Sequence, residues 1–235
     1  MGSGTARPGP PFRVWYARRA ASPPGDFLLT AIEGDLHPDR SVVDADDEAS
    51  GVGAKEAEES GRVLYRARYH DGWMTQVNVN ADLVPVAPPL WYLEVGEPDD
   101  DPPAMTLVAF ATDHVRDGTV VAASVLNQLA LGRTSQFGAL RWWVETGQVH
   151  QIYVAPPARR RGVGTKLALA GAAYCRGPGW PSLWGTGEVT DLGEAWIGQA
   201  VWRGRVDQRS RRMPPMTPPE EIAGIPDRNL FPDKT

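Results

Sequence analysis

One stretch of this sequence carries residue types whose spacing could bind an anion. It runs from Gln148 to Leu167 and reads QVHQIYVAPPARRRGVGTKL. Its alternating start predicts a strand, and a proline-containing basic loop then leads into a helix with apolar periodicity. A strand that enters a helix through a glycine-containing loop directs backbone N–H groups and the positive end of the helix dipole at one point, which suits a phosphate. The adjacent arginines Arg159 to Arg161 add positive charge there.

Two common phosphate-binding loops have a different spacing. In a P-loop, the last glycine is followed by Lys and then by Ser or Thr, whereas Thr165 precedes Lys166 here. The dinucleotide-binding fingerprint needs a small residue three positions after its second glycine, and Leu167 occupies that position. Neither loop fits this sequence.

The stretch from Val154 to Leu167, V-x-P-x-x-R-R-x-G-x-G-x-x-L, closely resembles the acetyl-coenzyme A loop of the GNAT superfamily of N-acetyltransferases. The core of that loop is Arg/Gln-x-x-Gly-x-Gly/Ala, and Arg159, Gly162 and Gly164 occupy its fixed positions. The resemblance covers about residues 105 to 203. It implies an α/β (α+β) fold with a mixed, mostly antiparallel sheet flanked by helices, and acetyl-CoA as the co-substrate.

By matched position, the resemblance assigns cofactor-binding roles to the strand and the loop. The pantetheine arm would pair like an extra strand with Ile152, Tyr153 and Val154, and the amide near Val154 would polarise the thioester carbonyl. Substitution of Gly162 would place a Cβ where the phosphates approach, so we expect it to weaken cofactor binding with little effect on folding. The pyrophosphate would contact Arg159, Arg160, Arg161, Gly162, Val163, Gly164 and Thr165.

Direct acetyl transfer needs a base that removes a proton from the attacking amine, but no covalent nucleophile. Strict strand alternation places His150 on the same face as Ile152 and Val154. His150 is the first candidate base, because an imidazole can accept a proton near neutral pH and arylalkylamine acetyltransferases are similar in having a histidine at this position. Glu145 and Glu188 are alternatives, and His150 could also be an ordinary strand residue.

Many relatives protonate the departing thiolate with a tyrosine after the second core helix, and this chain has no tyrosine beyond Tyr174. Tyr174 lies on an apolar stripe of the predicted loop helix with Val163, Leu167 and Ala170, so we interpret it as a core residue. Cys175 has no His or Asp beside it in the sequence, and we interpret it as a buried small residue rather than a nucleophile.

The chain divides into three predicted regions. Residues 1–103 form a β-rich N-terminal elaboration, in which the acidic segment 38–61 has the composition of a solvated loop. Residues 104–203 form the acetyl-CoA-binding core, and residues 204–235 form a tail rich in proline and charge, where the last two strands of the family are not evident. Strands are predicted at 12–16, 27–32, 62–69, 89–95, 105–111, 119–126, 139–144, 149–154 and 181–184, and helices from 163 to a stop at 177–179 and at 191–202.

Composition narrows the class of protein. A chain of 235 residues with 42% hydrophobic residues can bury a sizeable core. The net charge of −5 argues against a general nucleic-acid binder, and a single cysteine excludes an internal disulfide. The histidines lack zinc-ligand spacing, so no metal is expected. Because no apolar run is long enough to span a membrane, we expect a soluble, cytoplasmic protein without a membrane partner.

These observations favour an N-acetyltransferase that transfers the acetyl group of acetyl-CoA to an amine of a small molecule or a protein. Two alternatives stay open. One is a GNAT-fold relative that binds the cofactor or modifies a nucleobase, and the other is a non-enzymatic interaction protein, viral or regulatory, whose basic loop only resembles the motif. The sequence identifies neither the acceptor nor whether the chain forms a homodimer.

Overall fold

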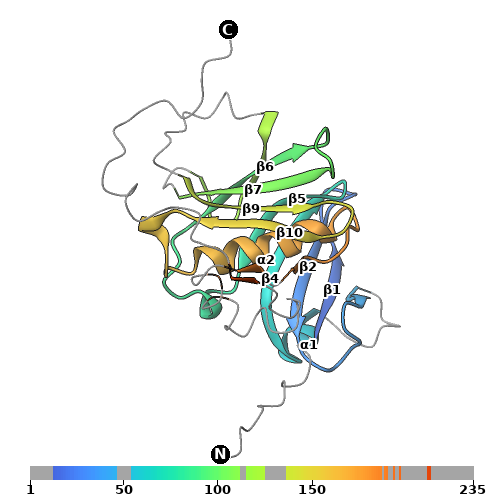
Figure 1. The fold of residues 1–235 in the computed structure, drawn as a ribbon. Coiled ribbons are helices and arrows are strands. Elements are labelled where there is room, and N and C mark those ends of the chain that lie inside the picture. The colour runs from blue at the N-terminus through green and yellow to red at the C-terminus, as the bar shows by residue number, and fades with distance from the viewer. Residues whose placement is uncertain are drawn as a thin grey trace, which may run out of the picture. The chain divides into compact units, whose positions relative to one another are not determined.

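The computed structural model describes residues 13–46, 54–111, 115–124, 136–186, 188–189, 193, 196 and 211–212. The chain separates into two compact units, Met1–Gly185 and Thr186–Thr235. The first unit contains two β-sheets and the helix that follows the basic loop (Figure 1). In the second unit, β12 (Glu188–Val189) pairs in parallel with β13 (Arg211–Arg212), so the C-terminal tail contributes a short strand where the sequence indicated none.

The first sheet has five strands in the order β3-β1-β2-β4-β5. Its neighbours are antiparallel except for the parallel pair β1 and β3. A short helix, α1 (Ala54–Glu59), lies against three of the strands. The strands are β1 (Val14–Ala20), β2 (Phe27–Glu33), β3 (Val42–Asp44), β4 (Arg62–His70) and β5 (Trp73–Val79).

The sequence missed three elements of this first sheet region. The acidic segment 38–61 is not a loop throughout, because it contains β3 and α1. Glu58 of α1 accepts two hydrogen bonds from the guanidinium of Arg66 on β4, at 2.9 and 2.7 Å, which ties the acidic helix to the sheet. The strand β5 was also missed, because its sequence WMTQVNV mixes polar residues into both faces of the alternation.

The second sheet has six strands in the order β11-β10-β9-β7-β6-β8. The four central strands are antiparallel, and the edge strands β8 and β11 run parallel to their neighbours, which is the mixed, mostly antiparallel sheet that the resemblance implied. The predicted boundary at residue 103 falls between two strands that pair along their whole length, β6 and β7. The strands are β6 (Trp91–Glu97), β7 (Ala104–Phe110), β8 (Val120–Ala122), β9 (Gln136–Trp143), β10 (Gln148–Val154) and β11 (Trp184–Gly185).

The helix α2 (Val163–Arg176) lies between the two sheets (Figure 1). The sequence predicted one buried stripe on this helix, but every residue from Thr165 to Cys175 is buried, because the five-stranded sheet covers the face that would otherwise meet solvent. Alanines and Gly171 make up most of the middle of the helix, and their small side chains allow both sheets to approach. The helix ends at Arg176, before the predicted stop.

The two sheets are joined at one side of α2. An isolated antiparallel bridge connects Gln76 of β5 to Thr119, and the Val77 amide donates to the Gly118 carbonyl at 2.8 Å. The Tyr92 amide of β6 in turn donates to the Thr119 carbonyl at 2.8 Å. The strand order therefore continues from the first sheet into the second around the helix. Among the described helices, none has the length and apolar character needed to cross a membrane.

Candidate cofactor-binding and catalytic site

Among the described residues, the strand before the basic loop has one edge that no strand covers beyond Val149, called here the open edge. β10 pairs with β9 along its length, but with β11 only at Gln148 and Val149. The Ala155 amide donates to the Phe137 carbonyl of the β9 side at 3.0 Å. In an antiparallel ladder the polar groups of successive residues point to opposite edges, so those of Tyr153 point toward β9 and those of Ile152 and Val154 point to the open edge. The resemblance named all three as backbone contacts, whereas the open edge presents Ile152 and Val154.

A β-bulge changes which side chains of β10 share a face. Val149 lies opposite Trp142 and Gln151 lies opposite Arg141, so His150 is the extra residue of the bulge. Strict alternation was therefore wrong beyond this point. Ile152 pairs with the buried Leu140 beneath α2, whereas the ring of His150 lies beside that of Trp143 on the opposite face of the sheet. The sequence carries no signal for the bulge.

The loop after β10 leads directly into the first turn of α2. It passes through the 3₁₀ turn Pro156–Ala158, and two of its residues adopt left-handed backbone, Arg160 at φ 58° and Gly162 at φ 75°. The first amides of a helix have no hydrogen-bond acceptors within the helix. In α2, the Lys166 amide donates to the carbonyl of Gly162, the residue just before the helix, at 3.0 Å. The side chains of Arg160 and Arg161 are exposed beside these amides. This geometry suits an anionic group at the helix start.

Gly162 faces the segment before β6. A Cβ at this position would lie 3.2 Å from the side chains of Ala87 and Val84. The expectation that a substitution would have little effect on folding was therefore wrong. The glycine is required because its φ of 75° is left-handed and because the segment before β6 packs against it. A side chain at Gly162 would disturb folding as well as binding.

Arg159 differs from the two arginines that follow it. Its side chain is partly buried, and its Nε–H donates to the carbonyl oxygen of Val154 at 3.0 Å. Its backbone amide donates to the Pro156 carbonyl at 3.3 Å. The side chain thus crosses from the loop back to the end of the strand.

Lys166 is buried behind the loop and has a structural role that the sequence did not indicate. Its Nζ donates to both carboxylate oxygens of Asp117, at 2.9 and 3.1 Å, and to the Pro88 carbonyl at 3.0 Å. Asp117 also accepts a hydrogen bond from the Leu90 amide at 2.7 Å. These hydrogen bonds occupy the three N–H donors of the ammonium group. Lys166 therefore holds α2 to the segment before β6 instead of contacting a ligand.

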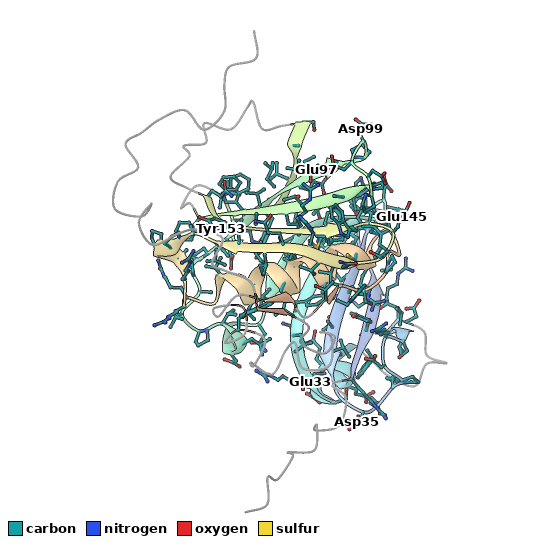
Figure 2. All side chains as sticks on the ribbon, in the orientation of Figure 1. Glu33, Asp35, Glu97, Asp99, Glu145 and Tyr153 are labelled. Carbon is teal, nitrogen blue, oxygen red and sulfur yellow. The ribbon has the colours of Figure 1, made fainter. Side chains whose placement is uncertain are left out.

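Two of the candidate bases, His150 and Glu145, lie near the bulged end of β10. His150 is exposed, and its ring centroid lies 4.6 Å from that of Trp143. Glu145 is exposed in the turn between β9 and β10, at the opposite end of β10 from the loop (Figure 2). His150 therefore lies on β10 itself, whereas Glu145 lies outside the strand. Glu188 lies on β12 of the second unit, where its side chain is outside the described residues.

A charged cluster lies on the same face of the sheet as His150. The Arg141 guanidinium lies 5.4 Å from the ring of Trp143 and donates to Glu97 at 2.6 Å, and it also pairs with Asp100. Thr106 donates to the same Glu97 carboxylate at 2.9 Å. These residues come from three strands and one turn, so no sequence spacing could have grouped them.

Two residues interpreted as core are buried as expected. Tyr174 is 1% exposed and packs against Trp142 and Trp180, and burial together with the nearby Glu94 raises the pKa of its hydroxyl. Cys175 is a buried free thiol whose pKa is raised to about 12 by burial. A thiol with such a pKa stays protonated near neutral pH, so Cys175 is not an activated nucleophile. Of the predicted helix 191–202, only Gly193 and Trp196 lie within the described residues.

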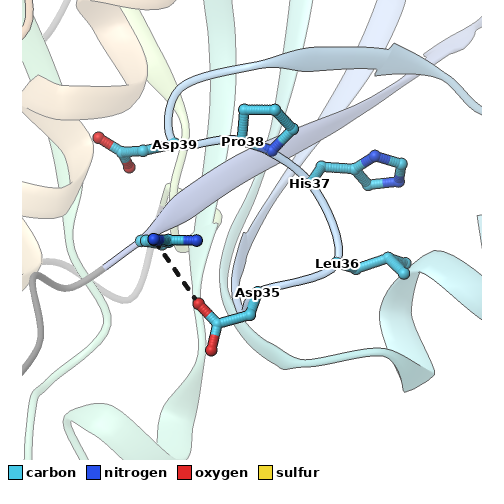
Figure 3. A pocket seen from close by; sticks show the side chains of 6 residues that line it. Asp35, Leu36, His37, Pro38 and Asp39 are labelled. Carbon is cyan, nitrogen blue, oxygen red and sulfur yellow. Dashed lines mark ion pairs between the residues drawn. The ribbon is translucent and has the colours of Figure 1, made fainter.

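A separate pocket of about 510 Å³ lies at the loop after β2 (Figure 3). It contains none of the predicted site residues. Its charged groups are largely exposed, and Arg13 pairs with Asp35 at 3.7 Å while Asp39 accepts a hydrogen bond from the Val14 amide at 2.8 Å. The pocket is lined by Arg13, Asp35, Leu36, His37, Pro38 and Asp39.

Comparison with known proteins gave one finding. Residues 75–191, about half of the chain, match the acetyltransferase (GNAT) family. The match begins within β5 and extends through β10, the basic loop and α2. Searches of curated proteins and of solved structures gave no match.

Proposed function

We propose, from the premise that this chain belongs to the GNAT family of acetyltransferases, that it transfers the acetyl group of acetyl-CoA to an amine by direct attack. The family supports acetyltransferase activity in general. The donor, the acceptor class and the roles of individual residues are our proposal. The acceptor is an amine on a small molecule or a protein.

The observation that carries the proposal is the open edge of β10 running into the helix start. The backbone N–H and C=O groups of Ile152 and Val154 point to the edge of β10 that β11 covers only as far as Val149. At the end of that edge lie the first amides of α2 and the exposed Arg160 and Arg161. An extended amide-containing arm attached to a pyrophosphate fits this sequence of groups, because the edge offers strand-like hydrogen bonds and the helix start offers an anion site.

The order of residues along the open edge gives the proposed order of the reacting groups. From the helix start, the edge passes Val154, then Ile152, and then reaches the bulge at His150. When bound there, acetyl-CoA supplies a thioester carbonyl as the electrophile. In our proposal the amide of Ile152 or Val154 donates a hydrogen bond to that carbonyl oxygen, which would stabilise the negative charge that develops during attack. We propose that His150, at the bulge, accepts the proton of the amine.

Calorimetric titration of acetyl-CoA tests the donor site directly. We expect binding by the wild-type protein and a loss of about tenfold or more in affinity in the double variant Arg160→Glu, Arg161→Glu, because two cations beside the helix start become anions. Arg19→Glu is the matched control, since Arg19 is an exposed arginine on β1 of the other sheet. No binding by the wild-type protein would contradict the proposed function and favour an interaction protein.

Release of the CoA thiol in the presence of a panel of amines then tests the chemistry. With a productive acceptor, we expect His150→Gln to lower kcat by about 100-fold and to leave acetyl-CoA affinity unchanged, because general-base catalysis contributes on this order. Glu145→Gln, in the turn, should lower kcat far less. If Glu145→Gln has the larger effect, the base is misassigned although the donor site stands.

A further inference from the structure

We infer that Arg159 is a positioning residue that holds the anion-binding loop in shape through its Nε–H, and that it does not bind the cofactor phosphates by its charge. This inference rests on the proposed function, since it concerns the loop that would hold acetyl-CoA. It separates Arg159 from its neighbours Arg160 and Arg161, to which the sequence alone gave the same role.

The contact that carries the inference closes the loop on itself. The Arg159 Nε donates to the Val154 carbonyl at 3.0 Å, which links the first residue after the loop turn to the last residue of β10. Within this ring, the Ala158 amide donates to Ala155 at 2.8 Å and the Arg159 amide donates to Pro156 at 3.3 Å. Ala158 is only 2% exposed. The segment from strand to helix is therefore a small, internally bonded unit.

The position of the Val154 carbonyl explains why its bond matters. This carbonyl points to the open edge of β10, the side on which an added chain would pair. The Arg159 side chain occupies it and so fixes the orientation of the peptide group that ends the strand. The residue after Arg159 adopts left-handed backbone at φ 58°, which is uncommon for a residue with a side chain and needs support from its surroundings. The hydrogen bond from the Arg159 Nε to the Val154 carbonyl, called the brace from here on, supplies that support at the turn into α2.

Side-chain chemistry allows the brace and the charge to be tested separately. In arginine the Nε is the fourth side-chain atom counted from Cβ. In glutamine the amide nitrogen is also the fourth atom, and it carries N–H donors. Lysine has a methylene at that position and its ammonium one atom further, and methionine has a methyl group there. Arg159→Gln thus keeps a donor and loses the charge, whereas Arg159→Lys keeps the charge but has no donor at the position of Nε. Arg159→Met loses both.

The test is calorimetric titration of acetyl-CoA into the wild-type protein and these three variants. We expect Arg159→Gln to stay within about threefold of the wild-type affinity, and Arg159→Lys and Arg159→Met to bind about tenfold more weakly, because each loses the partly buried hydrogen bond that shapes the site. A phosphate ligand would give the reverse order, with lysine better than glutamine, and that order would overturn the inference. Arg160→Gln with Arg161→Gln is the control, in which affinity and its salt dependence should both fall.

Amide hydrogen exchange in the cofactor-free protein tests the brace without relying on cofactor binding. We expect faster exchange over residues 154–165 in Arg159→Lys and Arg159→Met, and a rate near that of the wild type in Arg159→Gln. Equal exchange in all four proteins would overturn the positioning role. A wild-type protein that binds no acetyl-CoA would contradict the proposed function, while the exchange pattern would still decide whether Arg159 holds the loop.

Discussion

The two sheets hold α2 in different ways. On the six-stranded side, apart from the pairing of Lys166 with Asp117, the contacts are apolar and close, because Gly171 lies against Leu140 and Leu183, and Tyr174 packs edge-on against Trp142 at 5.8 Å between ring centroids. On the five-stranded side directional contacts add to the apolar packing. The Tyr69 hydroxyl donates to the Ala173 carbonyl at 2.7 Å, and the Arg176 guanidinium lies 4.4 Å from the ring of Tyr16.

This difference separates two tasks. The six-stranded sheet carries the open edge and the loop, and its packing against small residues sets how closely β9 and β10 approach the helix. The directional contacts of the five-stranded sheet gather at the end of α2 farthest from the loop. Changes in the five-stranded sheet should therefore reduce stability while the loop keeps its affinity for the cofactor.

The largest expected effect is on the six-stranded side, at Gly171. A Cβ there would collide with the Leu140 side chain and would lie 3.0 Å from Leu183, so Gly171→Val should lower the free energy of unfolding by about 3 kcal/mol through overpacking. Urea unfolding measures this. Gly96→Ala on β6 is the control, because its Cβ would meet only the Met105 methyl at an ordinary 3.6 Å. A similar cost for both variants would contradict the close packing of α2 on this sheet.

A smaller effect is expected when one tyrosine hydroxyl is removed on each side of α2, which compares the two sides directly. Tyr69→Phe leaves the buried Ala173 carbonyl without its side-chain donor and should cost about 1–2 kcal/mol, with acetyl-CoA affinity unchanged. Tyr174→Phe should change stability by less than about 0.5 kcal/mol, because the buried Tyr174 hydroxyl makes no hydrogen bond of good geometry within the described part of the chain, although Glu94 lies nearby. Thermal unfolding of both variants makes the comparison. Loss of cofactor affinity in Tyr69→Phe would show that the two tasks are not separate.

The smallest effect concerns pH and the five-stranded sheet alone. The His70 Nδ1 lies 2.6 Å from Asp26, with Asp71 at 3.4 Å from Nε2 and Arg68 pairing with Asp26 at 3.6 Å. The hydrogen bond to Asp26 and the charge of Asp71 raise the pKa of His70 above its ordinary value. The folded protein thus binds this proton more tightly than the unfolded chain does.

The sign of the pH effect follows from that raised pKa. The stabilisation by protonated His70 is fully present below about pH 6.5 and is lost as the pH rises through the pKa of the folded protein. The difference in melting temperature between the wild type and His70→Gln should therefore be largest in mild acid and should shrink above neutral pH. A difference that does not vary with pH would exclude this role for His70.

The sequence by itself determined the part of the protein that local chemistry specifies. Glycines and arginines at fixed spacing after an alternating strand indicated the loop, the helix that follows it and the family, because a left-handed turn at a helix start requires particular residues at particular positions. Burial of Tyr174 followed from the apolar period of the helix, and burial of Cys175 from the lack of a His or Asp beside it in the sequence. These features depend on neighbours within a few residues.

The tertiary structure decided what depends on distant partners. The bulge at His150 reassigns the faces of β10, Lys166 is neutralised by Asp117 from another part of the chain, and Gly162 packs against the segment before β6. The roles of three adjacent arginines also diverged only in the fold, because one of them reaches a strand carbonyl and the other two remain exposed. Strand register and long-range contacts produce no periodic pattern in a single sequence. The covering of α2 by the five-stranded sheet could therefore not be predicted from the sequence.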